Sequence, residues 1–582
     1  MTVGLTWPLT AQLTTHIPGE ATWAFDESTF VWNIWWFKQS LLVLGQSPLH
    51  TNHTFFPVGV NLTTYTFNLF NSALALPLQL AFSLPLANNF SLIFSYISAG
   101  YGMCLLSLYL LNYSTLPLTH RETFRVLKSK SEYLYFAAFL AGAVYAFSAS
   151  RMMYVALGHY NFVTIQWFPF YILFLLKTIR IGYHSHAFLA AIFAALCIYT
   201  ELTYSVFLIF LTLIVLVDEL VIQRFRDSTI QRFRELVIQR FNDSAIQRFN
   251  DSAIKRFRDS TLHLLPLSSL LLMTVLLITP FILLILPDFL NPAYAEPGWG
   301  EGLKLSADLI GLVTVTPLHF LSGLDWVIEL RAVIEGKGQF SDANTLFLGY
   351  GILALGLIGT LTYWRRVKAW FWGVVIFIIL SLGPLLTING QNRFDLDGLD
   401  VTFPLPFAIL HYIPIISANR VPNRFSIPLT LCLAVLVGHG VYWLLRKMSP
   451  AKPQTVFFTL FLLMVLLFDQ YSAPIPMTSA QIPTVYQQIG AESEPFTLMQ
   501  LPLGWRNSYG TLGAERTQLQ YYQSAHQRPM LGGNTSRNPA FKFDYFRQIP
   551  LFYALTETEL YRPVDEAILA QAKSQAAELM TL

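Results

Sequence analysis

Two adjacent acids stand directly before an aromatic segment near the N-terminus of this 582-residue chain. Asp26 and Glu27 precede a run that holds three tryptophans between residues 32 and 36. A carboxylate in this position can take a proton from a hydroxyl group as a general base, and a carboxylate pair can hold a divalent cation. An ordinary helix N-cap followed by an interfacial belt of tryptophans is the alternative, and residue types alone favour it.

A histidine and two arginines are the other residues whose types suit chemistry. His159 can orient an acceptor or donate a hydrogen bond to phosphate, although a lone histidine at a membrane surface is more often structural. Arg420 and Arg424 stand at the start of an apolar run, where an arginine fork and a helix N-terminus favour the same anion. Arginines that anchor lipid headgroups by snorkelling are the alternative to such a phosphate site.

Composition indicates that apolar helices must position these residues. The chain is 54% hydrophobic and 12% charged, with a mean hydropathy of +0.48, which excludes soluble enzymes, disordered chains and disulfide scaffolds and indicates an integral membrane protein. Ten runs are long enough, or nearly so, to span a bilayer. They cover residues 89–111, 134–150, 163–180, 186–200, 203–220, 263–287, 344–364, 371–389, 424–445 and 455–470.

The charges of the connecting loops predict which side of the membrane each loop faces. Basic residues follow the first and third runs, separate the seventh from the eighth, and follow the ninth, so these loops are expected in the cytoplasm. Residues 288–343 carry eight acids against three bases and are expected outside. The same parity puts Asp26, His159 and the polar residues after 470 outside. A net charge of only +3 gives no field that would attract nucleic acid.

These patterns predict a mainly α fold, a polytopic transmembrane bundle of about ten spans with a small C-terminal extracytoplasmic α/β segment. The expected parts are an N-terminal segment and first outer loop with interfacial helices, transmembrane helices, a cytoplasmic insert of octapeptide repeats, further transmembrane helices around the outer loop 288–343, and the C-terminal domain. They correspond to residues 1–88, 89–221, 222–262, 263–470 and 471–582. Met1–Leu13 is too short to span, so a first transmembrane helix is expected to be missing or truncated, and the alternative is that Met1–Leu13 lies on the membrane surface. The insert suits either a basic helix near anionic lipid or an expansion without a role.

Several short motifs, spread over most of residues 20–540, resemble those of the GT-C fold membrane glycosyltransferases. The resemblance is to a bacterial group near the lipopolysaccharide-type and mannosyl-type transferases. The motifs are Asp26 with Trp32-Asn33-Ile34-Trp35-Trp36, Phe56-Pro57-Val58-Gly59-Val60-Asn61-Leu62, Gly158-His159-Tyr160-Asn161, Ser306-Ala307-Asp308-Leu309-Ile310, Phe347-Leu348-Gly349-Tyr350, Arg420-Val421-Pro422-Asn423-Arg424-Phe425, Gln500-Leu501-Pro502-Leu503-Gly504 and His526-Gln527-Arg528-Pro529.

The resemblance implies transfer of a sugar from a polyprenyl-phosphate-linked donor to a glycan, lipid or protein acceptor at the outer surface of a bacterial inner membrane. It places the role of base or metal ligand on Asp26, with Glu27 as the fallback and His159 as a further catalytic candidate. Arg420 and Arg424 would bind the donor phosphate. A divalent metal, Mg²⁺ or Mn²⁺, is the one cofactor implied, although the second outer loop lacks the acid that related transferases carry there.

Two other functions stay open at this point. A transporter or flippase for lipid-linked sugars would carry ionisable residues within its spans, whereas the runs here are nearly free of them. A non-catalytic membrane scaffold would keep the fold and lose the activity. The polar residues gather at the ends of the apolar runs, which favours chemistry at the membrane surface.

Overall fold

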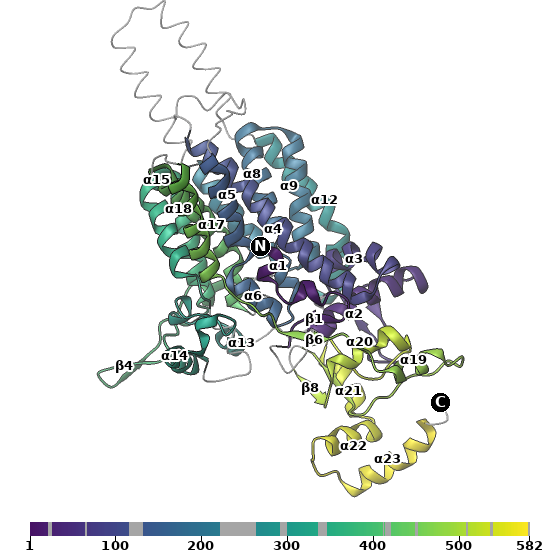
Figure 1. The fold of residues 1–582 in the computed structure, drawn as a ribbon. Coiled ribbons are helices and arrows are strands. Elements are labelled where there is room, and N and C mark those ends of the chain that lie inside the picture. The colour runs from purple at the N-terminus through teal and green to yellow at the C-terminus, as the bar shows by residue number, and fades with distance from the viewer. Residues whose placement is uncertain are drawn as a thin grey trace, which may run out of the picture.

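The computed structural model describes most of the chain as a mainly helical structure (Figure 1). The described residues are 1–20, 26–63, 67–115, 132–220, 264–290, 299–335, 346–410, 412–413, 419, 421–447, 452–507, 510–535 and 539–579. The repeat insert at 222–262 and Arg420 lie outside these ranges, so the expectations about them stay predictions.

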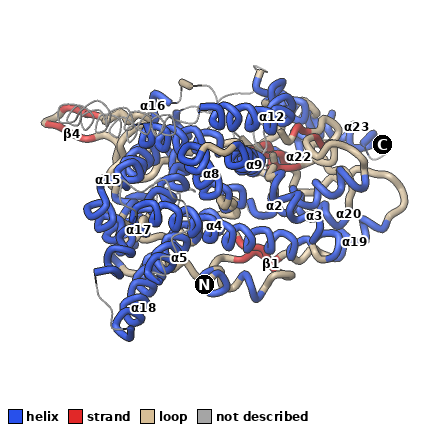
Figure 2. Tube along the Cα trace, turned by 90° about the horizontal axis from the view of Figure 1, so that it is seen from above, coloured by secondary structure: helices blue, strands red, loops and turns tan. Residues whose placement is uncertain are grey.

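Long apolar helices form one bundle, and each of them lies on a run expected from the sequence. They are α4 (Leu84–Thr115), α5 (Glu132–Ala146), α8 (Trp167–Ile181), α9 (His184–Thr200), the helix 204–220, α12 (Leu264–Phe289), α15 (Tyr350–Ser381), α17 (Ser426–Lys447) and α18 (Lys452–Asp469). Viewed along the bundle, α4 and α5 lie between a group that contains α15, α17 and α18 and a group that contains α8, α9 and α12 (Figure 2).

Within the described ranges, four helical segments are long and apolar enough to cross a membrane. They are Leu84–Asn112, Glu132–Ala156, Leu265–Pro287 and Pro422–Lys447. The last is 89% buried in the bundle, whereas Leu265–Pro287 is only 17% buried and leaves an apolar surface that suits lipid. The composition and these helices agree with a membrane protein, and the count of ten spans stays a prediction.

The helix α15 consists of two halves that fold back on each other at Tyr363, whose φ of −114° and ψ of 25° interrupt the helix. Gly356 in the first half contacts Leu433 of α17, and Gly373 in the second half contacts the neighbouring Cys432. A straight helix would hold the two glycines about 25 Å apart, so the chain must reverse between them. The halves correspond to the two runs expected at 344–364 and 371–389.

The predicted end of the second of these runs is wrong. The helix stops at Ser381, and the residues up to 389 form turns and bridges instead. Gly383 has a φ of 77°, and Pro384 has no N–H to continue the helical ladder. The prediction used hydrophobicity, which continues past residue 381. The helix ends there because of the backbone conformation of Gly383 and the missing N–H of Pro384.

Among the described residues, the charged groups after the third run and at the turn of α15 lie near one another at one end of the bundle. Arg180 at the end of α8 donates to Glu219 Oε1 through Nε and Nη2, at 3.0 and 2.6 Å. Neighbouring Asp218 lies within electrostatic range of both Arg180 and Lys368, which follows the turn of α15. Tyr363 in that turn packs near His439 and Tyr442 in the last two turns of α17.

At the opposite end, segments from both ends of the chain build one structure. Strand β1 (His16–Pro18) pairs antiparallel with β6 (Met477–Ser479). The helix α2 (Asp26–Lys38) packs against α20 (Thr517–His526), and Trp32 Nε1 donates to Gln523 Oε1 at 2.8 Å. Beside them lies a sheet with the order β8 (Thr511–Gly513), β7 (Gly504–Arg506) and β9 (Gly533–Asn534).

Shorter elements complete this end and the outer loops. The helices are α1 (Thr2–Leu5), α3 (Leu69–Ala81), α6 (Ala149–Ala156), α7 (Tyr160–Val163), α13 (Trp299–Lys304), α14 (Asp325–Glu335), α16 (Phe407–Leu410), α19 (Thr484–Ala491), α21 (Ala540–Arg547), α22 (Pro550–Glu559) and α23 (Glu566–Leu579). The strands are β2 (His50–Thr51), β3 (Val60–Asn61), β4 (Phe394–Leu396) and β5 (Leu399–Val401). The α3 helix lies on the stretch expected to be interfacial, at 67–85.

One apolar core joins the N-terminal segment to the C-terminal segment. It contains Trp32, Trp36 and Phe55 from the first and Trp505 and Phe546 from the second. The rings of Trp505 and Phe546 stack with centroids 4.2 Å apart. The expected boundary at residue 471 stays a prediction. The N-terminal segment and the residues after this boundary share one apolar core.

Candidate active site

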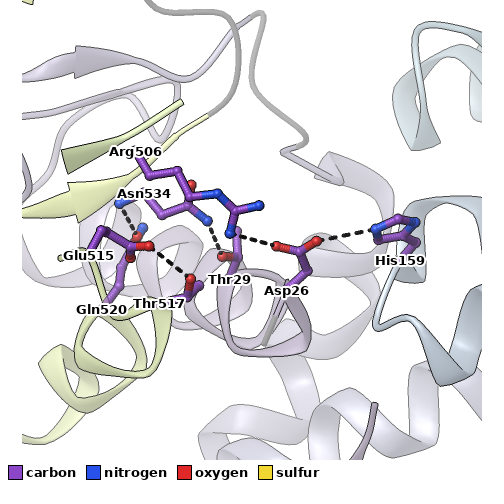
Figure 3. A network of polar contacts seen from close by, with 8 residues as sticks. All are labelled: Asp26, Thr29, His159, Arg506, Glu515, Thr517, Gln520 and Asn534. Atoms are coloured by element: carbon purple, nitrogen blue, oxygen red, sulfur yellow. Dashed lines mark hydrogen bonds and ion pairs between the residues drawn. The ribbon is translucent and has the colours of Figure 1, made fainter. Parts of the chain in front are cut away.

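The start of α2 and the loop between α6 and α7 bring Asp26 and His159 together (Figure 3). His159 Nε2 lies 3.2 Å from Asp26 Oδ2, and the two side chains are 21% and 19% exposed. Gly158 makes this approach possible, since its φ is 72° and a Cβ there would lie 2.6 Å from the backbone nitrogen of Glu27. The sequence predicted both residues on one side of the membrane, and the structure brings them into contact.

The geometry of His159 makes it an orienting group for Asp26. Its Nδ1 is buried without a hydrogen-bond partner among the described residues. Because Nε2 faces a carboxylate oxygen, the proton belongs on Nε2, which then donates to Asp26. A buried Nδ1 cannot meet a substrate, so Asp26 is the member of the pair that can react.

Arg506 of β7 contributes the third charge of the site, from the C-terminal segment. Its Nη1 lies 3.5 Å from Asp26 Oδ1, and its side chain is 17% exposed. Asn534 Nδ2 on the neighbouring strand β9 donates to Thr29 Oγ1 on α2 at 3.1 Å, and this contact holds the sheet against the helix (Figure 3). Sequence reasoning missed Arg506, since nothing local to it signals a partner near the N-terminus.

A buried acid, Glu515, lies beside Arg506. Burial raises the pKa of Glu515 to about 7, while the arginine opposes that rise. Thr517 Oγ1 donates to Glu515 Oε2 at 3.2 Å. Asp26, Arg506 and Glu515 therefore form a row of alternating charge when Glu515 is ionised.

The structure does not support Glu27 as the fallback base. Glu27 is fully buried, and Thr478 Oγ1 of β6 donates to its Oε1 at 2.6 Å. Burial is the main cause that raises the pKa of Glu27 to about 7. Gly19 and Gly158 close over its carboxyl group, and a Cβ on either would lie within 3 Å of its atoms. Glu27 therefore fastens α2 to the β1–β6 pair, away from any substrate.

Arg424 lies next to the loop that carries His159. Its guanidinium stacks over the ring of Phe162 at 3.8 Å from the centroid. Tyr154 lies within electrostatic range of Arg424, and its ring centroid is 6.2 Å from that of His159. The structure thus places one of the two expected phosphate-binding arginines near the Asp26–His159 pair.

An acid that sequence reasoning missed approaches the loop that carries His159 and Asn161. Asn161 Nδ2 donates to Glu201 Oε2 at 2.6 Å, and Thr203 Oγ1 donates to Glu201 Oε1 at 2.9 Å. Glu201 follows α9 and is partly exposed. The loop itself has no acid, but the fold supplies one from a helix end.

Two other acids, Asp308 and Asp469, bind backbone N–H groups and hold loops and helix ends in place. Asp308 is buried and accepts from the backbone N–H groups of Ile310, Asn389 and Gly390, at 2.9, 3.0 and 2.8 Å. Asp469 Oδ2 accepts from Ile352 N at 2.9 Å, at the start of α15. A buried carboxylate with this many backbone donors is a structural staple.

Two solved structures resemble the chain in their overall path. They are the archaeal oligosaccharyltransferase AglB from Archaeoglobus fulgidus in complex with an inhibitory peptide and a dolichol-phosphate, and an Archaeoglobus fulgidus oligosaccharyltransferase in the apo form. Each is 13% identical in sequence, with TM-scores of 0.42 and 0.41. The match covers 91% of this chain and 62% and 63% of those chains, so the chain spans about three fifths of their length. No protein-family model and no curated protein matches the chain.

The side chains around Asp26 do not fit the divalent metal that the resemblance implies. In the part of the chain that the structure describes, no three His, Cys, Asp or Glu side chains converge as metal ligands. One Asp26 oxygen faces the Arg506 guanidinium and the other faces His159, and a dication would have to sit beside the arginine. This geometry suits a carboxylate that takes a proton better than one that binds a metal.

Proposed function

We propose that this chain is an integral membrane glycosyltransferase of the GT-C kind, which transfers a sugar from a polyprenyl-phosphate-linked donor to an acceptor hydroxyl. One observation carries the proposal. A partly exposed carboxylate, Asp26, is held between an imidazole N–H and a guanidinium at the end of the bundle opposite the basic loops. Such a group combines an oriented base with a cation for a leaving phosphate.

In the proposed reaction, Asp26 accepts the proton of the acceptor hydroxyl as its oxygen attacks the anomeric carbon. The bond between that carbon and the donor phosphate oxygen breaks, and the phosphate leaves on its lipid. The Asp26 side chain is 19% exposed, so a hydroxyl can approach the carboxylate beside its contacts with His159 and Arg506. His159 fixes the direction of the carboxylate, and the guanidinium of Arg506 lies on its other oxygen.

The leaving phosphate gains negative charge as the bond breaks, and arginines are suited to stabilise it. Arg506 lies beside the base, and Arg424 lies beside the loop of His159. A guanidinium forms strong, charge-assisted hydrogen bonds to phosphate oxygens. Arg420 stays part of this proposed phosphate site on sequence grounds. None of these steps needs a metal.

The proposed reaction takes place at the outer surface of a bacterial inner membrane, with the C-terminal segment on the same side. The charge pattern of the loops supports this side. The acceptor is a glycan, a lipid or a protein of the cell envelope. The membrane lipids hold the polyprenyl chain of the donor.

The test is sugar transfer from a polyprenyl-phosphate donor by the purified full chain in nanodiscs. Asp26→Asn should lower transfer by about 10²-fold or more, the scale expected for loss of a general base, while the variant stays folded and binds the donor. Asp400→Asn, which changes an exposed acid in the β4–β5 hairpin, is the matched control and should leave transfer unchanged. Full transfer by Asp26→Asn would remove Asp26 from the mechanism. No transfer by the wild type with any of several sugars would favour a scaffold.

A further inference from the structure

A polar cavity lies at the other end of α2 from Asp26. Its volume is ≈ 250 Å³, far above the roughly 30 Å³ that one water molecule takes in the liquid. Lys38 at the cavity lies twelve positions after Asp26 on the same helix, which corresponds to about 18 Å. The cavity is therefore a separate site from the candidate active site.

The polar lining of the cavity carries a single charge, that of Lys38, and amide and hydroxyl groups from four other positions. These are Gln39, Gln79, Ser524 and Gln527. Lys38 forms no hydrogen bond or ion pair with another described residue. Gln79 Nε2 donates to Ile34 O at 2.8 Å, which leaves its Oε1 as an acceptor. No acid lines the cavity, so the local charge favours an anion.

The rim of the cavity is apolar and exposed. Val43 and Phe82 line it and are 62% and 57% exposed. Leu42, next to Val43, and Leu80, two positions before Phe82, are 56% and 65% exposed. Soluble surfaces rarely gather large apolar side chains in this way, whereas the boundary between headgroups and acyl chains accommodates them.

The membrane helix α4 starts at this rim. Leu84, its first residue, lines the cavity. Further along α4, Phe90, Ile97 and Tyr101 are 46%, 56% and 60% exposed, at spacings that lie on one helix face. A molecule with its polar group in the cavity therefore has the apolar side chains of Val43, Phe82 and Leu84 beside it for an apolar chain.

We infer that this cavity binds the phosphodiester headgroup of an anionic phospholipid of the surrounding membrane. Lys38 contacts the phosphate, the amides and the serine hydroxyl bond the glycerol and ester oxygens, and the apolar rim receives the acyl chains. A lysine near the membrane surface attracts anionic lipid, and its long stem lies well along an apolar rim. The amides and Trp35 would also suit a saccharide, but a saccharide gains nothing from exposed leucine and phenylalanine side chains.

Binding of defined lipids to the purified full chain tests this inference without a transfer assay. In detergent, native mass spectrometry compares dioleoylphosphatidylglycerol with dioleoylphosphatidylcholine. The wild type should prefer the anionic lipid, and Lys38→Gln should weaken its binding by about tenfold or more, the scale of one charge-assisted contact. Lys573→Gln, at an exposed position on α23, is the matched control and should bind like the wild type.

A second variant separates filling of the cavity from loss of charge. Ser524→Trp keeps Lys38 but occupies the space, and it should also lose the bound anionic lipid. Unchanged far-UV circular dichroism and melting temperature verify that each variant is folded. Because no sugar transfer is measured, failure of this inference is distinct from failure of the proposed function.

Three outcomes would overturn the inference. Equal binding of the two lipids by the wild type would remove the anionic preference. Displacement of the lipid by inorganic phosphate at the same concentration would assign the site to a soluble anion. Binding of a soluble glucose oligosaccharide, lost in Ser524→Trp, together with no lipid preference, would assign it to a saccharide.

Discussion

The two ends of the helical bundle use charge in different ways. At the end formed by the basic loops, Arg180 and Glu219 are 39 positions apart in sequence and close the ends of neighbouring helices, with side chains only 10% and 6% exposed. At the other end, Asp26 meets His159, 133 positions away, and Arg506 from the C-terminal segment. These three side chains are 17–21% exposed.

The difference separates charged side chains that stabilise helix packing from charged side chains that a substrate can reach. A buried ion pair offers little surface to a ligand, and the charge of each partner offsets the desolvation of the other. Asp26 is held by two groups from distant segments yet stays open to solvent. An arrangement of this kind gains nothing for helix packing, and it suits an oriented reactive group.

The most decisive way to break this comparison is to show that both ends face the same side of the membrane. With Cys104 replaced by alanine, Ser493→Cys in the exposed loop after α19 should react with an impermeant thiol reagent on intact cells. Arg365→Cys, in the exposed turn of α15, should react only after the cells are opened. The reverse labelling pattern would invert the topology and place Asp26 in the cytoplasm.

The sealed pair should matter for stability and leave transfer unchanged. Arg180→Gln leaves Glu219 buried without its partner, and we expect a loss of about 3 kcal/mol, the scale for breaking a buried pair. Thermal unfolding in detergent measures this loss, and transfer per folded molecule should equal that of the wild type. The double variant with Glu219→Gln should recover part of the stability. A drop in transfer by the folded single variant would show that this end takes part in the reaction.

The buried acid under Asp26 should make stability depend on pH. The pKa of Glu27 rises from 4.5 to about 7 in the folded chain because of burial. The folded state therefore holds a proton that the unfolded state releases, so stability falls as the pH rises from about 4.5 through about 7. Glu27→Gln should reduce this slope and stabilise the chain at pH 8 by about 2–3 kcal/mol.

Unfolding temperatures of the two proteins between pH 5 and 8 check this prediction. Glu515 contributes a slope of the same sign, since its pKa is also about 7, so the variant keeps part of the dependence. A wild-type stability that increases over this range would show that Glu27 is ionised in the folded chain.

The smallest expected effect concerns the cation that the C-terminal segment supplies. Arg506→Gln should lower the turnover of the proposed transfer about tenfold, or about 1.4 kcal/mol. The reason is that the phosphate then leaves without the positive charge of the guanidinium beside it. Arg506→Lys should retain part of the rate. Arg562→Gln, which removes the 60% exposed arginine of an ion pair with Glu557, is the control. Equal rates in all three variants would limit Arg506 to holding the C-terminal segment in place.

The sequence identified part of the site, and the reason is visible in the contacts. Asp26 and His159 share a membrane side that loop charge predicts, and they touch. Glu27 has the same residue type and neighbourhood in sequence, yet it points into the protein because α2 turns it toward β6. Arg506 and Glu201 have no local signal at all, since each enters the site from a distant element.

The sequence by itself determined the class of protein, the positions of its apolar helices and the end of the bundle where the polar residues gather. These follow from hydrophobicity and charge, which are properties of single residues and short windows. The tertiary structure alone decided which acid is buried and which is open, and that an arginine from the C-terminal segment faces the N-terminal Asp26. Those outcomes depend on pairing between β1 and β6 and between α2 and α20, and such long-range contacts are fixed only when the whole apolar core closes.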